Sequence, residues 1–367
     1  MTLEDIALTL QPGIGPRTAA HLLQIFGDAR TIYATSLQAL EREAGLRHDL
    51  AEALVRRSAH AQAEKELRHM ERHGIEAIAS TDDAYPTLLR ECPDYPHVLY
   101  LKGDPSVLQR RLLSMVGTRK FTPTYASTVC NRLVEGLAER IPDLCIVSGL
   151  AFGIDKECHA AALRCGVPTI AVVACPLPEI TPAQHTAFAR EIVERGGAIV
   201  SELHSATKQN GALFLARNRI IAGLSAGTVI VQSEAEGGSL QTAAMAESYH
   251  RSLMAVPGDI TRPNARGTNR LIRDQRAVLI ESAEDIIREL MWDTDPHIGP
   301  KPPRAAAALS EDAQRVLACF PEGEAISIDR IAEKTALDPG TLGELLFELE
   351  TEGAIGFQPG NRLIKTC

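Results

Sequence analysis

Two arginines and an asparagine stand together in a segment that otherwise has the pattern of a buried helix. The segment runs from Phe214 to Ser225, F-L-A-R-N-R-I-I-A-G-L-S, and its later apolar residues recur at helical spacing. We expect Arg217, Asn218 and Arg219 in the first turn, where free backbone N–H groups and the positive end of the helix dipole lie. Basic and amide side chains at that position favour an anionic ligand.

Small and basic residues also follow the strands that the sequence predicts. G-T-R-K (117–120), S-G-L-A-F-G-I-D (148–155) and S-E-A-E-G-G-S-L-Q-T (233–242) each come after an apolar run. Ligands bind a doubly wound sheet at the carboxyl ends of its strands. Small residues there let backbone N–H groups approach an anion, and Arg119 can hold a phosphate in its planar fork. The sequence therefore predicts a phosphate site at one edge of a sheet.

The strands that must position these residues alternate with helical segments. Repeated β-α units indicate an α/β fold with a mostly parallel sheet wound on both faces, and residues 82–103 add a small antiparallel piece at the sheet edge. The strands are expected at residues 112–116, 145–147, 169–174, 198–200, 228–231, 253–256 and 278–280.

Several kinds of catalytic site are not expected. The chain has no G-x-x-x-x-G-K-[ST] P-loop, and no G-x-G-x-x-G follows the first predicted strand of the parallel sheet. We expect no G-x-S-x-G nucleophile elbow. Asp155 and His159 share a helix face, which would suit acid–base or metal chemistry, but a helix cap at Asp155 and a packed, hydrogen-bonded His159 are favoured. We expect no catalytic residue, no metal and no cofactor.

Composition limits the class of protein. At 367 residues, with 45% hydrophobic and 23% charged residues, the chain is typical of a globular protein of two or three domains. The net charge of −9 disfavours diffuse binding of a polyanion more than it disfavours a focused basic site. The cysteines form no C-x-x-C and are expected as buried thiols in a reducing cytoplasm. With no leader and no apolar run of roughly 20 residues, a soluble, cytoplasmic protein without a membrane segment is expected.

The chain divides into four parts. Residues 1–80 have a helical pattern, 81–292 form the α/β domain, 293–308 are a proline-rich linker, and 309–367 have the helix order of a winged helix. In the first part, residues 10–23 resemble the hairpin of helix-hairpin-helix and sterile-alpha-motif-like modules. Gly13 and Gly15 there either let two helices pack closely, which is favoured, or let the turn hold a DNA phosphate.

The winged helix has an acidic third helix. Residues 309–367 contain 11 acidic and 5 basic residues, and the predicted helix 339–352 has no lysine or arginine. A partner-binding or accessory role is therefore favoured over reading of the DNA major groove, although Arg362 and Lys365 on the wing leave the second role open. The helix carries Glu344, Glu348, Glu350 and Glu352.

Taken together, these motifs resemble the DNA-processing protein A family (DprA, also called Smf). The resemblance spans about residues 80–290 and implies an extended Rossmann-like domain. The motifs that carry it are V-G-T-R-K (116–120), V-S-G-L-A-F-G-I-D (147–155) with His159, F-L-A-R-N-R-I-I-A-G-L-S (214–225), G-S-L-Q-T-A (238–243), V-P-G (256–258) and G-T-N-R-L-I (267–272).

The resemblance implies a non-enzymatic protein of natural transformation. Such a protein binds and protects incoming single-stranded DNA, helps to load the RecA recombinase onto it, and forms a homodimer through the opposite side of the domain. Phe214 either stacks a base or packs the helix entrance. With 4% aromatic residues, affinity is expected mostly from phosphates. The DNA-binding residues that the family implies are Arg119, Lys120, Ser148, Gly149, Phe214, Arg217, Asn218, Arg219, Ser239 and Thr242. Lys208, in the loop before Phe214, is expected as a further phosphate contact.

Two stretches depart from the family pattern. A-C-P-L-P-E-I-T-P (174–182) replaces a glycine-rich turn in one wall of the site, and D-Q-R-A (274–277) lies near the expected dimer surface. The alternative function is an enzyme that cleaves the glycosidic bond of nucleoside monophosphates. Related Rossmann proteins of that kind carry two glutamates in a glycine-rich loop, whereas residues 236–245 place alanines there. Arg119 and Arg217 are expected to face solvent, so that charge reversal at either would leave the fold intact.

Overall fold

The computed structural model describes residues 1–292, 310–320, 326–335, 337–351, 354–358 and 362–365. The chain divides into two compact units, Met1–Ile298 and Gly299–Cys367. The predicted linker 293–308 lies outside the described residues. The boundary at residue 80 stays a prediction, because the hydrophobic cluster of the N-terminal helices continues into Val98, Tyr100 and Ile199 of the sheet.

Six short helices begin the first unit. Thr2, Asp28 and Ser36 cap three of them through their side chains. Gly13 has a positive φ of 86°, and a Cβ atom there would lie 2.7 Å from Leu50 Cδ2, so this turn is packed closely. The helices are α1 (Leu3–Leu10), α2 (Pro16–Phe26), α3 (Ala29–Ala34), α4 (Leu37–Ala44), α5 (His48–Val55) and α6 (His60–His73).

Nine strands form one sheet in the described part of the first unit, in the order β1-β2-β6-β5-β4-β3-β7-β8-β9. β1 and β2 are antiparallel to their neighbours, and the strands from β6 to β9 are parallel, which confirms the predicted fold class. The strands are β1 (Glu76–Ala79), β2 (Val98–Gly103), β3 (Arg111–Val116), β4 (Leu144–Ser148), β5 (Thr169–Val172), β6 (Ala198–Ser201), β7 (Gly227–Ile230), β8 (Ser252–Ala255) and β9 (Val278–Leu279).

One strand departs from the expected pattern. The prediction that residues 1–80 form only helices is wrong at β1, since Glu76–Ala79 pairs along the edge with the apolar strand β2. Four residues are too few to show an alternation of polar and apolar side chains.

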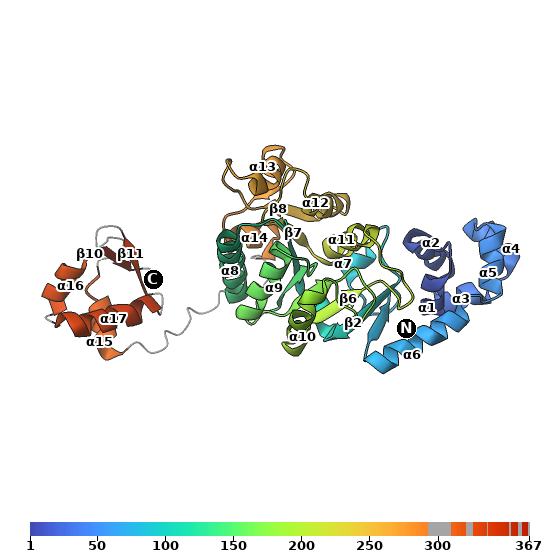
Figure 1. The fold of residues 1–367 in the computed structure, drawn as a ribbon, viewed down its shortest axis with the longest axis horizontal. Helices are drawn as coiled ribbons and strands as arrows, with labels where there is room; N and C mark the ends of the chain where they lie inside the picture. The colour runs from blue at the N-terminus through green and yellow to red at the C-terminus, as the bar shows by residue number, and fades with distance from the viewer. Residues whose placement is uncertain (293–309, 321–325, 336, 352–353, 359–361, 366–367) are drawn as a thin grey trace. The chain divides into compact units, whose positions relative to one another are not determined.

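Helices cover both faces of the sheet, as Figure 1 shows. Cys145 and Val147 of β4 face the cluster with the helices α7 (Thr87–Arg90), α11 (Ala212–Leu224), α12 (Ser239–Ser248) and α13 (Arg266–Arg273). Ile146 faces the cluster with α8 (Pro123–Arg140), α9 (Ile154–Arg164) and α14 (Ala283–Glu289). α10 (Thr186–Glu194) packs with β5 and β6 in the cluster that the N-terminal helices share.

The cysteine prediction is confirmed for five thiols. The cysteines of the described residues are free, and these five are buried within the sheet or beneath its helices: Cys92, Cys130, Cys145, Cys158 and Cys175.

The second unit has the order of a winged helix, as predicted. Its core includes Val316, Ile331 and Leu349. Glu344 is exposed, and Glu348 accepts hydrogen bonds from the backbone and hydroxyl of Ser310. The elements are α15 (Glu311–Leu317), β10 (Ile326–Ser327), α16 (Ile328–Thr335), α17 (Pro339–Thr351), β11 (Ile355–Gln358) and β12 (Arg362–Lys365), with the strands in the order β10-β12-β11.

Candidate functional site

The candidate site lies at the carboxyl edge of the parallel strands, where the winding direction reverses. β3 stands between β4 and β7, because the chain winds outward from β3 to β6 and then returns to the other side of β3. Ligands of α/β sheets bind at such a reversal. The loops that follow β3, β4 and β7 contain Arg119, Gly149 and Glu234, respectively.

Glycines let the loops after β3 and β4 meet. Gly153 has a positive φ of 88°, and a Cβ atom on it would lie 2.4 Å from the carbonyl oxygen of Thr118. The backbone N–H of Ile154, the first residue of α9, donates to the same oxygen at 3.3 Å. The start of α9 is therefore held against the loop that carries Arg119.

Arg119 and Lys120 are exposed on the loop after β3, as predicted. The guanidinium carbon of Arg119 lies 5.9 Å from the ring centroid of Phe214, near the start of α11, and Phe214 is half-buried. Lys120 Nζ lies 3.8 Å from a carboxylate oxygen of Glu234, but the lysine side chain is 82% exposed, so this pair is weak. A cation and an aromatic face thus stand together at the sheet edge.

Arg217 does not occupy the position that the sequence predicts. Asn210 Oδ1 accepts from the backbone N–H of Ala212, and α11 begins there, so Arg217 lies beyond the first turn. The prediction that Arg217 faces solvent is wrong. Its side chain is buried, and Nη1 donates to the carbonyl oxygen of Val172 at 2.6 Å. Nε has no hydrogen-bond partner within the part of the chain that the structure describes.

Asp155 is the buried counter-charge of Arg217. Burial raises the pKa of the Asp155 carboxyl, and the Arg217 guanidinium and the backbone N–H groups of Gly117 and Ala151 act in the opposite direction. Burial likewise lowers the pKa of Arg217. Asp155 lies in the first turn of α9, as expected, but its carboxylate joins two preceding loops and makes no side-chain cap.

Arg219 is also engaged inside the molecule. Its Nη2 donates to a carboxylate oxygen of Glu202, which follows β6, and both side chains are largely buried. Burial raises the pKa of Glu202, and the Arg219 guanidinium acts against this rise. The prediction of a first-turn position is wrong for Arg219 and for Asn218, because α11 starts two residues before Phe214. The side chain of Asn218 is half-buried.

Three of the predicted residues that carry hydroxyl groups are buried. Ser148 is buried and donates to the carbonyl oxygen of Met115, while Ser239 donates to Ser233 Oγ. Thr242 is 2% exposed within α12. The hydroxyls of Ser148 and Ser239 therefore stabilise the loops of the site from beneath. Lys208, in contrast, is exposed in the segment between β6 and α11.

Phe152 is a candidate that the sequence reasoning missed. It lies in the glycine turn after β4, is 46% exposed, and its ring packs edge-on against His185 at 4.7 Å between centroids. His185 Nδ1 is in turn within 2.8 Å of the carbonyl oxygen of Leu150. A large apolar residue between two glycines of a strand-end loop was the signal that could have found it.

His159 is a core residue, as favoured. Its Nδ1 donates to Thr169 Oγ1 at 2.7 Å, and Thr169 donates to the carbonyl oxygen of Ile146. Burial lowers the pKa of His159 to about 3. The described residues contain no group of three metal-ligating side chains and no helix long and apolar enough to cross a membrane.

One serine lies in a matching pattern without forming a nucleophile elbow. The residues G-L-S-A-G at 223–227 match G-x-S-x-G. Ser225 ends α11 and precedes β7, so it lies on a helix-to-strand connection and not on the strand-to-helix turn of a nucleophile elbow. It is fully buried and accepts a hydrogen bond from Ser114 Oγ at 2.8 Å.

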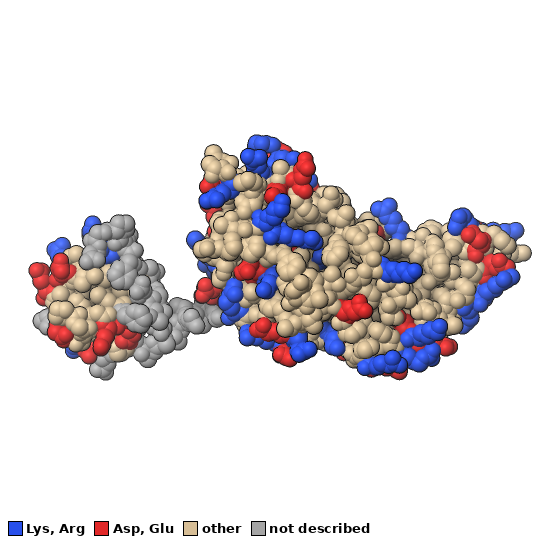
Figure 2. Space-filling model, in the orientation of Figure 1, with Lys and Arg blue, Asp and Glu red and all other residues tan. Residues whose placement is uncertain are grey.

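The surface around the site is rich in basic side chains. Figure 2 shows Lys and Arg residues on the drawn face around the position of β7, between α9 and α12. The net charge of −9 therefore coexists with a local basic surface.

Comparison with known proteins identifies a family. Residues 76–291 match the family described as DNA recombination-mediator protein A, and residues 300–361 match the DprA winged helix domain. The chain is 34% identical to Protein Smf of Escherichia coli over 312 residues, which covers 83% of this chain and 82% of that one. It is 39% identical to DNA processing protein DprA of Bacillus subtilis over 218 residues, covering 59% and 72%.

Two solved structures are similar. The X-ray structure of DNA processing protein A from Streptococcus pneumoniae aligns with a TM-score of 0.67 at 28% identity, covering 79% of this chain and 98% of that one. The second, from Helicobacter pylori, aligns with a TM-score of 0.53 at 29% identity over 60% of this chain and 97% of that one. That structure concerns the single-stranded DNA binding mode of the Helicobacter pylori protein.

Proposed function

This chain belongs to the DNA recombination-mediator protein A family, and from that premise we propose that the carboxyl edge of its sheet binds single-stranded DNA. The pairing of Arg119 with the ring of Phe214 is the observation that carries the proposal. One nucleotide presents a phosphate and a base, which a guanidinium and an aromatic face can bind together. The single-stranded DNA binding described for the Helicobacter pylori relative supports the same ligand.

The predicted DNA-binding residues divide into two groups by exposure. Arg119, Lys120 and Lys208 are exposed and are proposed to bind phosphates. Arg217 and Arg219 are buried and are proposed to position the loops. Affinity is therefore assigned to the exposed cations.

The proposed role is non-enzymatic. The segment aligned with the nucleoside-monophosphate hydrolase loop has Ala243 and Ala244 where that chemistry needs carboxylates. Ala243 is fully buried inside α12 and so leaves no room for a reacting group. Release of free base from AMP by the purified protein would support the enzyme instead.

The wider role that we propose is recombination mediation in natural transformation, in the cytoplasm. The protein would protect incoming single-stranded DNA and load RecA onto it as a homodimer. The edge strand β9 offers support for self-association, because Val278 and Leu279 are each 43% exposed. Exposed apolar side chains on an unpaired edge favour pairing with another chain.

Fluorescence anisotropy of labelled oligo-dT tests the proposed site. Arg119→Glu should weaken binding strongly, because it replaces a phosphate contact by repulsion. Arg132→Glu is the matched control, since Arg132 is exposed on α8 and the described residues show no ion pair for it. Equal affinities of the two variants would reject the sheet edge as the binding site.

A further inference from the structure

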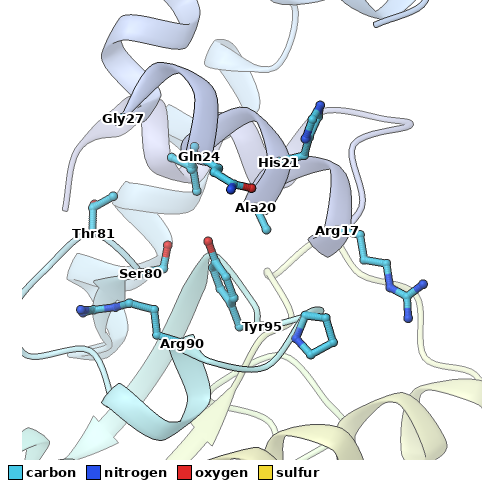
Figure 3. A pocket seen from close by; sticks show the side chains of 11 residues that line it. Arg17, Ala20, His21, Gln24, Gly27, Ser80, Thr81, Arg90 and Tyr95 are labelled. Carbon is cyan, nitrogen blue, oxygen red and sulfur yellow. The ribbon is translucent and has the colours of Figure 1, made fainter. Parts of the chain in front are cut away.

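A cleft of about 560 Å³ lies between helix α2 and the segment that contains α7, as Figure 3 shows. One wall is a face of α2, where residues four and seven positions after Arg17 align with it. The other wall comes from the turn after β1 and from α7 and the segment that follows it. The lining includes Arg17, His21 and Gln24 on the first wall and Ser80, Arg90 and Tyr95 on the second.

The cleft is basic, and no acidic side chain of the described residues neutralises its two arginines. Arg17 and Arg90 are exposed, and within the described residues no carboxylate lies within ion-pair distance of either. Arg90 is held in place by neutral groups, because Nη2 donates to the carbonyl oxygen of Asp82 at 2.7 Å and the guanidinium lies 5.7 Å from the Tyr85 ring. The Asp82 carboxylate itself forms an ion pair with the amino group of Met1. Both positive charges remain available to an anion.

The polar groups of the cleft suit an extended ligand. In Figure 3, the guanidinium groups of Arg17 and Arg90 lie at opposite ends of the cleft and point away from each other, while the hydroxyls of Ser80 and Tyr95 lie in the space between the two side chains. A single phosphate would use one arginine only. A ligand with at least two negative charges in a row, separated by hydrogen-bonding groups, would use both.

The cleft is joined structurally to the sheet-edge site. Helix α7, which carries Arg90, packs against α11, which carries Phe214. On the other side, the Glu66 carboxylate of α6 accepts from the backbone N–H of Ser205 at 3.0 Å, three residues before Lys208. The segment with Lys208 is therefore fixed between the N-terminal helices and the start of α11.

We propose that this cleft is a second phosphate-binding site for the strand held at the sheet edge, with Arg17 and Arg90 as its cations. The proposal rests on the proposed function. A strand bound at Arg119 and Phe214 would pass the exposed Lys208 and continue between α2 and α7. The predicted helical hairpin then contributes a face of its second helix, Arg17 included, and not its glycine turn.

Strand length tests the proposal. Binding of oligo-dT of about 6 and about 25 nucleotides is measured over a salt series, because one site of this kind spans roughly 4–16 nucleotides. For the long strand, Arg17→Ala combined with Arg90→Ala should lower the slope of log affinity against log salt by about 1.4, or about 0.7 per lost phosphate contact. The short strand should bind both proteins equally.

Control variants distinguish failure of the second site from failure of the proposed function. Arg42→Ala removes an exposed arginine of α4 that does not line the cleft, and it should leave both slopes unchanged. Arg17→Ala alone, which disturbs no contact of Arg90, should lower the long-strand slope by about 0.7. An unchanged slope in the double variant overturns the second site while the sheet-edge site stands. Absence of wild-type binding to either strand rejects the proposed function itself.

A free nucleotide is the competing source of phosphate. Titration of dTMP against wild type and Arg17→Ala, followed by calorimetry, separates the two sources. Two results together would overturn the strand proposal in favour of a mononucleotide site. Arg17→Ala would abolish the binding of dTMP, and the double variant would leave the salt slope of the long strand unchanged.

Discussion

The Nη1 atom of Arg217 lies so close to Gly149 that a Cβ atom on this glycine would be 2.0 Å from it. The same Cβ atom would lie 2.6 Å from a carboxylate oxygen of Asp155. Gly149 is therefore the point at which the turn after β4 fits against a buried pair of opposite charges. The candidate site is supported by this pair from within, while its exposed cations come from other loops.

Gly149→Ala should destabilise the protein. The added methyl group meets two buried charged groups that have little freedom to move, so a loss of about 1–3 kcal/mol is expected in the free energy of unfolding. Thermal unfolding followed by circular dichroism measures it. Gly238→Ala is the control, because a Cβ atom there meets nothing within 4 Å and its φ is −61°. Equal stability of the two variants would show that the Gly149 turn is not tightly packed.

Charge reversal should affect stability differently at the buried Arg217 and at the exposed Arg119. Arg217→Glu places a second carboxylate beside buried Asp155 and should cost about 3–5 kcal/mol of stability. Arg119→Glu lies on an exposed loop and should change the free energy of unfolding by less than about 0.5 kcal/mol. Urea unfolding of both variants is the measurement. A stable Arg217→Glu protein would contradict the buried position of Arg217.

Acid should destabilise the protein through His159. The folded chain keeps His159 neutral down to about pH 3, whereas an ordinary histidine has a pKa of 6.5. Between these values the unfolded state binds more protons, so the stability contributed at neutral pH is lost as the pH falls below 6.5. His159→Gln should remove roughly 2–3 kcal/mol of the loss expected between pH 7 and pH 4.5.

The comparison of wild type with His159→Gln isolates this residue from the carboxylates that titrate in the same range. The raised pKa of Asp155 acts in the opposite sense, since its protonation in the folded state favours folding at low pH. Urea unfolding at several pH values gives the two curves. Parallel curves would mean that His159 is protonated in the folded protein.

Phe214 is expected to stack a base. Phe214→Ala should weaken binding of oligo-dT by about 1–3 kcal/mol and should have little effect on an abasic strand of equal length. If Phe214 only packs the helix entrance, the variant lowers the melting temperature and both strands bind equally well per folded molecule. Anisotropy titrations with the two strands distinguish these outcomes.

The winged helix is expected to be dispensable for strand binding. Removing residues 309–367 should leave the affinity for oligo-dT within about twofold, because the proposed contacts lie in the first unit and the third helix of the second unit lacks basic residues. Loss of binding on truncation would move the site to the second unit.

Sequence reasoning reached the sheet and its functional edge but not the burial of the arginines. The strands could be predicted because apolar runs recur between helical segments. The position of Arg119 could be predicted because this residue closely follows such a run. The start of α11 could not be predicted from the sequence, since it depends on the Asn210 side chain and on a glycine cap that lie outside the apolar pattern. The partners of Arg217 lie far away in sequence, at Val172 and Asp155.

Photocrosslinking tests the central claim most directly. A single strand of about 12 nucleotides carrying 5-bromouracil is irradiated with the full-length protein, and the crosslinked peptides are identified by mass spectrometry. The account predicts crosslinks in the peptides that contain Arg119, Phe152 or Phe214, which Arg119→Glu reduces. Crosslinks confined to residues 310–365, with none at the sheet edge, would contradict it.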